Sequence, residues 1–369
     1  MAGKRAGATP KVMHVITSLE TGGAERMLER LVLAHRERPV SFHVVSLLPG
    51  GAVAERLRAA GIPVTALGMR RGRPDPRGLF RLARLIRRVK PDVVQSWLYH
   101  ADILATVALL WSGRRRRTKL FWSVRCSSME SAQRSFAPDL ARGICVRLSR
   151  RADVVVANSH VGRDFHQALG YRPRRFLVID NGIDTDQFRP DSAARSAVRA
   201  ELGIADGKAL IAMIARLDPV KDYDTFLRAL EFLPEVSALA VGGGTETLPA
   251  RPGLYRLGER RDVARLLPAC DVVVSTSLSE GFPNSVLEAM AAGVPVVATD
   301  AGDSRRILGD TGIIVPPVDP GAVAVAVRQL LGESSEARQL RKARARERAI
   351  EHFAISRMVE AYDALYREA

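Results

Sequence analysis

Short apolar runs typical of strands alternate with amphipathic helical stretches along almost the whole chain of 369 residues. Repeated alternation of this kind predicts βα units, in which the strands pair in parallel and helices cover both faces of the sheet. In the first half we expect strands at 11–17, 40–48, 64–67, 93–97, 119–124, 154–158 and 176–180, and helices at 24–35, 53–60, 78–89, 101–111, 138–150 and 161–169.

The alternation restarts after Asn181-Gly182-Ile183-Asp184, a turn-rich segment that we interpret as a hinge. A chain of this length exceeds what one hydrophobic core usually serves, so two α/β domains are expected. The second half predicts strands at 209–215, 237–241, 254–257, 272–275, 294–298 and 312–315, and helices at 222–232, 263–267, 320–331, 335–352 and 355–367, with a further helix beginning at Ser285. Our domain boundaries are a disordered tail at 1–10, an N-terminal domain at 11–185, a C-terminal domain at 186–352 and a final segment at 353–369.

Composition excludes several classes of protein. Hydrophobic residues make up 47% of the chain, but no run of 18 apolar residues predicts a transmembrane helix. Residues 1–11 are small, polar and basic without the apolar core of a secretory signal. Cys126, Cys145 and Cys270 lack the spacing of a metal or redox motif, which favours reduced thiols in a cytoplasmic protein.

The net charge of +16, from 56 Lys and Arg against 40 Asp and Glu, predicts attraction to polyanions. Few aromatic residues interleave with the arginines and no nucleic-acid motif is visible, so we expect no nucleic-acid partner. An anionic membrane surface is the alternative hypothesis, and solvated helix faces are the simpler one. The residues that motivate the membrane hypothesis are the run Arg114–Arg117, the basic face of Arg81, Arg84, Arg87, Arg88 and Lys90, and the stripe of Leu140, Ile144 and Leu148 beside Arg142, Arg147 and Arg150.

Two carboxylates stand eight residues apart around a predicted helix start, at Glu280 and Glu288. Ser285 and Glu288 match the capping box, which would place the helix N-terminus at Ser285. A helix that begins beside the carboxyl end of a parallel strand offers unpaired N–H groups and a positive dipole to a phosphate. The two glutamates could then hold sugar hydroxyls around a diphosphate. The alternative is that Glu288 is only a capping partner and Glu280 is only a solvated loop acid.

Two further loops follow predicted strands. Arg216 and Lys221 lie on the loop after strand 209–215, where a guanidinium and an ammonium can converge on one diphosphate. Gly22 and Gly23 follow the first strand and allow close approach of a ligand to the backbone. The glycine pair is not the G-x-G-x-x-G signature, which disfavours a nicotinamide enzyme.

Together the segments 216–221 and 280–288 resemble the Arg-x4-Lys and Glu-x7-Glu motifs of retaining nucleotide-sugar glycosyltransferases of the GT-B fold, family 4, and the resemblance extends over nearly the whole chain. It implies two facing Rossmann-like doubly wound parallel sheets with a cleft between them, and a last helix that crosses back to the first domain. It also implies a metal-independent transfer of a sugar from a nucleotide-diphosphate sugar to an acceptor hydroxyl, with retention of anomeric configuration and without cofactor. No Asp-x-Asp metal site appears in the sequence.

The resemblance also implies roles for individual residues. Arg216, Lys221 and the backbone near Asn284 and Ser285 would stabilise the departing diphosphate, while Glu280 binds the sugar and Glu288 the ribose. The loop of Gly22 and Gly23 reaches the diphosphate, and the backbone at Gly258 and Arg260 contacts the nucleobase. The family's active-site histidine aligns with either His100 or Trp97. His100, Asn158 and Asn181 are candidate sugar or acceptor contacts, and caps or turns are the alternative for the two asparagines.

Family habit and basic charge predict a lipid-linked or cell-surface glycan as acceptor, in polysaccharide biosynthesis. The expected location is the cytoplasm, with peripheral attachment to the inner face of the cytoplasmic membrane. Two alternatives stay open at this point. One is a glycogen-synthase-like or phosphate-using GT-B enzyme, and the other is a non-catalytic basic scaffold for membranes or nucleic acid.

Overall fold

The computed structural model describes residues 9–20, 22–70, 75–125, 139–205 and 207–369, with the backbone alone at 139–142. Most of the predicted tail, Cys126, the first residue of the helix expected at 138–150, and the side chains of Leu140 and Arg142 therefore lie outside the described residues. The chain divides into unit 1, Met1–Asn181 with Ile355–Ala369, and unit 2, Gly182–Ala354. Each unit is described by itself.

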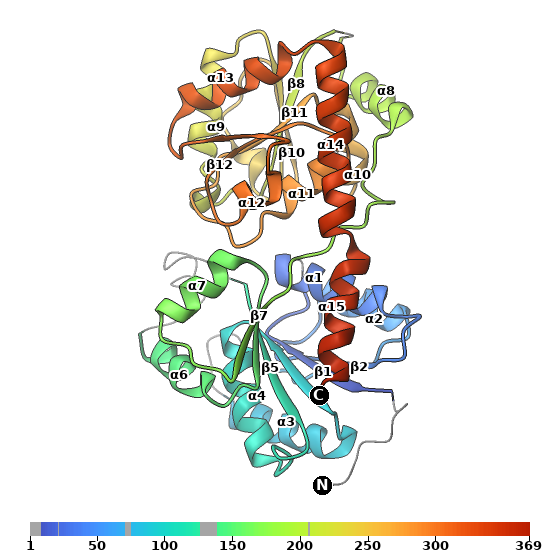
Figure 1. The fold of residues 1–369 in the computed structure, drawn as a ribbon, viewed down its shortest axis with the longest axis vertical. Coiled ribbons are helices and arrows are strands. Elements are labelled where there is room, and N and C mark those ends of the chain that lie inside the picture. The colour runs from blue at the N-terminus through green and yellow to red at the C-terminus, as the bar shows by residue number, and fades with distance from the viewer. Residues whose placement is uncertain (1–8, 21, 71–74, 126–138, 206) are drawn as a thin grey trace. The chain divides into compact units, whose positions relative to one another are not determined.

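Unit 1 is built on a seven-stranded sheet in the order β3-β2-β1-β4-β5-β6-β7, with every neighbouring pair parallel (Figure 1). Parallel strands need crossover connections, which the helices between them provide. The strands are β1 (Lys11–Ile16), β2 (Ser41–Ser46), β3 (Val64–Ala66), β4 (Val93–Trp97), β5 (Lys119–Val124), β6 (Val154–Ala157) and β7 (Arg175–Val178). The helices are α1 (Gly23–Ala34), α2 (Ala52–Ala59), α3 (Pro76–Val89), α4 (Tyr99–Trp111), α6 (Asp139–Ser149), α7 (His160–Ala168) and α15 (Ile355–Arg367).

Unit 2 repeats the design with a six-stranded sheet in the order β10-β9-β8-β11-β12-β13, again parallel. Its strands are β8 (Leu210–Ile214), β9 (Ser237–Val241), β10 (Leu254–Gly258), β11 (Val272–Ser275), β12 (Val296–Thr299) and β13 (Ile313–Val315). Its helices are α8 (Ser192–Glu201), α9 (Tyr223–Ala229), α10 (Val263–Leu266), α11 (Asn284–Ala291), α12 (Ser304–Leu308), α13 (Pro320–Leu331) and α14 (Ser335–Phe353), with the short 3-10 turns η1 (Pro219–Lys221), η2 (Leu230–Phe232), η3 (Thr245–Thr247) and η4 (Leu267–Ala269). The doubly wound parallel α/β class is thus confirmed in both units.

Each sheet has a core on both faces because successive side chains of a strand point to opposite sides. In β1, Val12 and Ile16 pack with residues of α1, α2 and α15, whereas Met13 and Val15 pack with residues of α3 and α4 (Figure 1). Unit 2 is arranged in the same way, with α8, α11 and α14 over one face and α9 and α13 over the other. Strands covered on both faces read as continuous apolar runs, as the sequence predicted.

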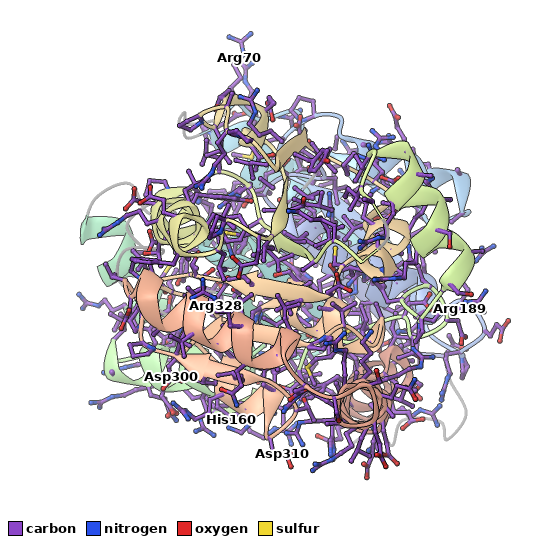
Figure 2. All side chains as sticks on the ribbon, turned by 90° about the horizontal axis from the view of Figure 1, so that it is seen from above. Arg70, His160, Arg189, Asp300, Asp310 and Arg328 are labelled. Atoms are coloured by element: carbon purple, nitrogen blue, oxygen red, sulfur yellow. The ribbon has the colours of Figure 1, made fainter. Side chains whose placement is uncertain are left out.

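Outside these cores the surface of unit 2 is densely charged. The side chains of Arg328 and Asp310, labelled in Figure 2, are 53% and 68% exposed. Exposed ion pairs such as Arg328 with Glu235 contribute little to folding stability.

Polar and aromatic contacts fasten α15 to the sheet of unit 1. The buried hydroxyl of Tyr366 donates to Oε1 of Gln95 on β4 at 2.6 Å, and the Tyr366 ring packs edge-on against His14 of β1. The pKa of His14 is lowered to about 3, mainly by burial and then by the neighbouring His35. A neutral imidazole therefore lies inside this contact.

Several predicted elements are confirmed to the residue, including 93–97, 119–124, 237–241, 272–275, 320–331 and 355–367. Within the described ranges, the prediction missed two helices. The first, α8, begins at the N-cap Asp191, whose carboxylate accepts from the Ala194 N–H at 2.8 Å. The second, α12, has only five residues and no side-chain cap, so it carries little periodic signal.

Replacing Tyr366 by Phe is expected to lower the free energy of unfolding by about 1–3 kcal/mol, because the buried Gln95 Oε1 would lose the hydroxyl donor of Tyr366. Urea unfolding of wild type and variant measures the change. Tyr255→Phe is the matched control, since Tyr255 is half-buried and its hydroxyl makes no hydrogen bond recorded among the described residues. Equal losses in the two variants would contradict the proposed anchoring of α15.

Candidate functional site

The residues predicted for the diphosphate lie on two loops that follow neighbouring strands of unit 2. Arg216 and Lys221 follow β8, and Glu280 follows β11, which pairs directly with β8. The strand order changes direction between these two strands. Open parallel sheets bind their ligands beyond the carboxyl ends of the strands at such a point.

The two loops meet through an ion pair between Lys221 and Glu280. Lys221 Nζ lies 2.5 Å from Glu280 Oε1, and Ser277 Oγ donates to the same oxygen at 2.7 Å. The side chains of the pair are only 24% and 11% exposed. In contrast, the side chain of Arg216 is 71% exposed and lies 3.3 Å from Asp218. The structure thus joins Lys221 to Glu280 and leaves the guanidinium of Arg216 at the surface.

Backbone and hydroxyl contacts hold the two loops together. Thr276 Oγ1 donates to the Asp222 carbonyl at 2.8 Å, and the Leu278 N–H donates to the Val220 carbonyl at 2.8 Å. On the other side, Thr299 Oγ1 of β12 donates to the Ser277 carbonyl at 2.6 Å. The position of Glu280 is therefore determined by three successive strands.

Glycines permit this close packing of backbone. Gly242 follows β9 with a φ of +144°, and a Cβ there would lie 2.1 Å from the Ala215 carbonyl oxygen. Gly302 follows β12 with a φ of +56°, and a Cβ there would lie 2.2 Å from the Glu280 carbonyl oxygen. Neither clash could be relieved by rotating a side chain, because the obstacle is backbone.

The capping box predicted at Ser285 and Glu288 is wrong. Helix α11 begins one residue earlier, at Asn284, with Pro283 as N-cap and no side-chain cap. Ser285 is then already the second residue of the helix, where its hydroxyl cannot serve as the N-cap acceptor. Asn284, Ser285 and Glu288 are all half-buried on this short helix, which directly follows the Glu280 loop. Glu288 therefore lies on the helix that follows the Glu280 loop, and it is not the partner of an N-cap at Ser285.

The third predicted segment of unit 2 lies at the end of β10. Gly258 is buried with a φ of +63°, and its N–H donates to Thr245 Oγ1 at 3.1 Å. The guanidinium of Arg260 turns to Asp262 and makes two hydrogen bonds of 2.7 Å. These side-chain bonds raise the pKa of Arg260 and lower that of Asp262. The Arg260 side chain is thus engaged within its own loop.

In unit 1 the predicted glycines and histidine also lie at the point where strand order changes direction, between β1 and β4. Gly22 is the extended N-cap of α1, and a Cβ there would meet only the movable carboxylate of Glu25. A Cβ at Gly23 would meet nothing within 4 Å. Internal packing therefore does not demand the glycine at position 23. His100, the second residue of α4, is exposed, although partial desolvation lowers its pKa.

Trp97, the other position that the resemblance suggested for a histidine, belongs to the core. Its Nε1 donates to His14 Nδ1 at 3.1 Å, and the guanidinium carbon of Arg125 lies 4.4 Å from the centre of its ring. Arg125 Nη1 also donates to Asn181 Oδ1 at 2.6 Å, so the amide oxygen of Asn181 is engaged in unit 1. Arg125 is a residue that the sequence did not single out.

Asn158 differs from Asn181 in its surroundings. It is 6% exposed at the end of β6, and its Oδ1 has no hydrogen-bond partner among the described residues. The neighbouring Ser159 is a helix cap, since its Oγ accepts from the Gly162 N–H at 3.0 Å. An unpaired buried amide oxygen marks Asn158 as able to accept from a ligand hydroxyl.

Among the described residues, no group of three His, Cys, Asp or Glu side chains is arranged to hold a metal ion. Sequence inspection missed Ser277, Thr299 and Gly302, which position the Glu280 loop. The available signal was their place at or just after the carboxyl ends of β11 and β12, at the same edge of the sheet as Arg216. Hydroxyl and glycine residues at such an edge are too common to be selected without the strand order.

Replacing Gly302 by Ala is expected to destabilise unit 2 by about 1–3 kcal/mol more than Gly203→Ala, since only the former adds a clash with backbone. Both glycines have a positive φ, +56° and +65°, which a residue with a Cβ adopts only at a cost. A Cβ at Gly203 would meet nothing within 4 Å. Thermal unfolding compares the two variants, and equal melting temperatures would refute a tight Gly302 contact.

Comparison with known proteins yields two family matches. Residues 21–187 match the Glycosyltransferase Family 4 model, and residues 208–333 match the model of glycosyl transferases group 1. The chain is 34% identical over 237 residues to D-inositol 3-phosphate glycosyltransferase of Mycobacterium tuberculosis, an alignment that covers 59% of this chain and 49% of the relative. The chain thus spans about half the length of the curated relatives it matches.

Solved structures agree in fold. Anabaena HepE in complex with UDP-glucose is 23% identical with a TM-score of 0.83, covering 97% of this chain and 100% of the other. WaaG, a glycosyltransferase involved in lipopolysaccharide biosynthesis, is 17% identical with a TM-score of 0.71, covering 96% and 99%. The chain therefore has the GT-B fold, with an N-terminal segment that matches the Glycosyltransferase Family 4 model and a C-terminal segment that matches the glycosyl transferases group 1 model.

Proposed function

We propose that this protein transfers a sugar from a nucleoside-diphosphate sugar to an acceptor hydroxyl. The observation that carries the proposal is the Lys221–Glu280 pair beside Arg216 at the carboxyl edge of β8 and β11, inside the segment that matches glycosyl transferases group 1. The glycosyltransferase named among the relatives and the UDP-glucose complex of HepE support a nucleotide sugar as donor.

In this proposal the donor's diphosphate binds Arg216 and Lys221. The first turn of α11, at Asn284 and Ser285, adds backbone N–H groups, because a helix leaves its first N–H groups without intrahelical acceptors. Glu280 accepts from sugar hydroxyls. The remaining donor contacts are Glu288 to the ribose, the backbone at Gly258 and Arg260 to the base, and the backbone at Gly22 and Gly23 to the diphosphate.

The chemical step breaks the bond between the anomeric carbon and the β-phosphate oxygen. Negative charge develops on that phosphate, and cations held in place beforehand stabilise it. The acceptor oxygen forms its bond on the same face, and its proton passes to the departing phosphate oxygen, so configuration is retained and no enzymic base is needed. We propose that Arg216 and Lys221 supply the positive charge without a divalent ion.

For the acceptor we propose a lipid-linked or cell-surface glycan. The role of WaaG in lipopolysaccharide biosynthesis supports this class. Asn158, with its unpaired buried Oδ1, is the better supported of the proposed sugar contacts. His100 is retained as an exposed candidate, and Asn181 as a weaker one because Arg125 already donates to it.

Membrane attachment is proposed for the end of α4 in unit 1. No described helix is long and apolar enough to cross a bilayer. Trp111 is 56% exposed, and Arg87 Nη2 donates to its carbonyl at 2.7 Å. Of the run Arg114–Arg117, Arg115 is bound internally to Asp153 at 3.0 Å, whereas Arg116 and Arg117 are exposed. An exposed indole beside arginines suits the interface of an anionic bilayer.

Arg216→Ala is expected to reduce kcat/KM with the nucleotide-sugar donor by an amount equivalent to about 2–4 kcal/mol, the scale of one lost oxyanion donor. Its melting temperature should stay near wild type, because the side chain is 71% exposed. Arg228→Ala is the matched control, since Arg228 is 57% exposed and also faces a carboxylate in unit 2. Steady-state kinetics after a screen of nucleotide sugars makes the comparison.

Wild-type kinetics in Arg216→Ala would overturn the assignment of Arg216 to the diphosphate. The same assay separates the alternatives left open by the sequence. Turnover with free phosphate in place of a nucleotide would favour a phosphate-using enzyme. Absence of transfer with every donor, together with intact folding, would favour a non-catalytic scaffold.

The membrane proposal predicts sedimentation with vesicles that contain anionic lipid, and release as salt is raised, because the Debye length shortens. Trp111→Ser and the double variant Arg116→Gln/Arg117→Gln should each weaken binding. Phe232→Ser is the control for the tryptophan, since Phe232 is 52% exposed in unit 2. Equal binding to neutral and anionic vesicles would refute the electrostatic attachment.

A further inference from the structure

Unit 2 has a basic pocket at the edge of its sheet opposite to Lys221 and Glu280. The pocket has a volume of about 370 Å³ and lies beside Asp271 and Ala209, at the amino ends of β11 and β8. The donor-site candidates follow the carboxyl ends of the same strands. The two sites are therefore separated by the length of the strands.

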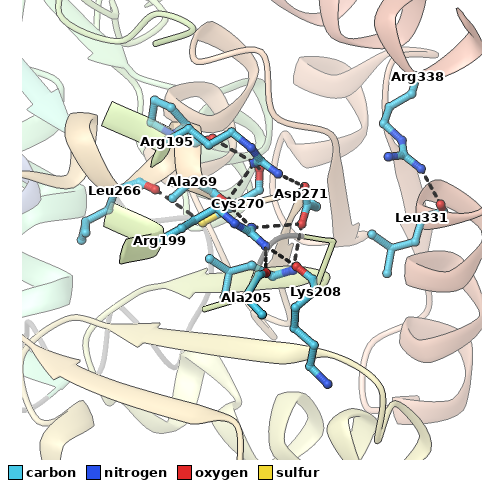
Figure 3. Close-up of polar contacts among 12 residues, drawn as sticks. Arg195, Arg199, Ala205, Lys208, Leu266, Ala269, Cys270, Asp271, Leu331 and Arg338 are labelled. Carbon is cyan, nitrogen blue, oxygen red and sulfur yellow. Dashed lines mark hydrogen bonds and ion pairs between the residues drawn. The ribbon is translucent and has the colours of Figure 1, made fainter. Parts of the chain in front are cut away.

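Positive charge predominates in this pocket. Four basic side chains and the single carboxylate of Asp271 are among its lining residues (Figure 3). Asp271 is fully engaged, since Oδ1 lies 2.7 Å from Arg195, while Oδ2 accepts from the Leu210 N–H at 2.8 Å and lies 3.6 Å from Arg199. The basic side chains are Arg195, Arg199, Lys208 and Arg338.

Two of these arginines are held rigidly by main-chain carbonyls. Arg195 Nη1 donates to the Ala269 carbonyl at 3.0 Å, and Arg199 Nη1 donates to the same carbonyl at 3.1 Å. Arg199 also bonds the carbonyls of Ala205 and Lys208 (Figure 3). Carbonyls satisfy the N–H groups but carry no net charge, so the two guanidinium charges are only partly balanced by Asp271. The positive electrostatic potential of the pocket is therefore fixed by the folded backbone that holds Arg195 and Arg199.

The other cations retain unused donors. Lys208 is exposed, and no described residue forms a hydrogen bond or ion pair with its Nζ. The pKa of the nearby Glu235 is lowered, first by a hydrogen bond from its own backbone N–H and then by the charges of Arg328 and Lys208. The ion pair of Glu235 is with Arg328 at 3.3 Å, and not with Lys208. Arg338 Nη2 donates to the Leu331 carbonyl, whereas the Nε of Arg338 is buried without a partner.

A fifth cation reinforces the imbalance. Lys342, on α14 one turn beyond Arg338, is half-buried, and its pKa is lowered first by desolvation and then by Arg195 and Arg338, with Asp271 acting in the opposite direction. A cluster in which basic groups depress one another's protonation gains stability when an anion enters. The buried donor of Arg338 and the ammonium of Lys208 provide contacts for it.

We propose that this pocket binds a small polyanion with adjacent phosphate groups, independently of the donor site. The pocket holds several fixed cations and one carboxylate that is already engaged, so it favours a ligand that carries more than one negative charge. The volume lies within the range of small-molecule pockets. The structural alternative is that Arg195 and Arg199 only fasten α8 to the chain around Ala269.

Pyrophosphate is the probe, and isothermal titration calorimetry the measurement. The double variant Lys208→Gln/Lys342→Gln is expected to bind pyrophosphate at least roughly tenfold more weakly than wild type, the effect of losing charge-assisted contacts. The double variant Lys11→Gln/Lys119→Gln is the charge-matched control, since both lysines are exposed at the starts of β1 and β5 in unit 1. Arg216→Ala should retain the pocket's binding, because Arg216 lies at the other edge of the sheet.

Wild-type affinity in the double variant would overturn the proposal, as would complete loss of binding in Arg216→Ala, which would place the pyrophosphate at the donor loops. Equal affinity for sulfate at matched ionic strength would identify an adventitious ion only. The single variant Lys208→Gln should show the same direction with a smaller change, so the test does not depend on folding of the double variant. Melting temperatures without ligand are recorded for each protein.

Discussion

The direct parallel pairing of β8 with β11 is the constraint on which the chemistry of unit 2 depends. Strands that are neighbours in the sheet but distant in sequence bring their following loops together at one edge, and only this pairing lets Lys221 reach Glu280. The pairing is itself covered on both faces by apolar side chains, which secures its register. A slip by one residue would exchange those faces and separate the loops.

The same strands organise both ends of unit 2. At the carboxyl edge, hydroxyl and backbone contacts hold a lysine against a glutamate, so the ammonium of Lys221 is fixed beside one carboxylate. At the amino edge, carbonyls orient Arg195 and Arg199, and Asp271 balances only part of their charge. The contrast is physical, because one carboxylate faces one ammonium at the first edge but two guanidinium groups at the second. The two edges are therefore suited to different anions.

Periodicity predicted the elements well where a strand is buried on both faces or a helix is long. The strand at 272–275 and the helix at 355–367 are recovered to the residue. The sequence-based predictions failed where they depended on a few neighbouring residues. The capping box at Ser285 was wrong because α11 begins at Asn284 behind Pro283, and α12 is too short to show a period. The arginine run at 114–117 likewise looked uniform in sequence, whereas Arg115 is bound to Asp153.

By itself the sequence determined the parallel α/β class, the two-unit division and the loops that carry Arg216, Lys221 and Glu280, because hydrophobic period and motif spacing are local properties of the chain. Tertiary structure alone decided which of those loops touch. The contact of Glu280 with Lys221, the need for glycine at Gly302 and the basic pocket around Asp271 each join residues that are far apart in sequence. They follow from strand order, which no local pattern encodes.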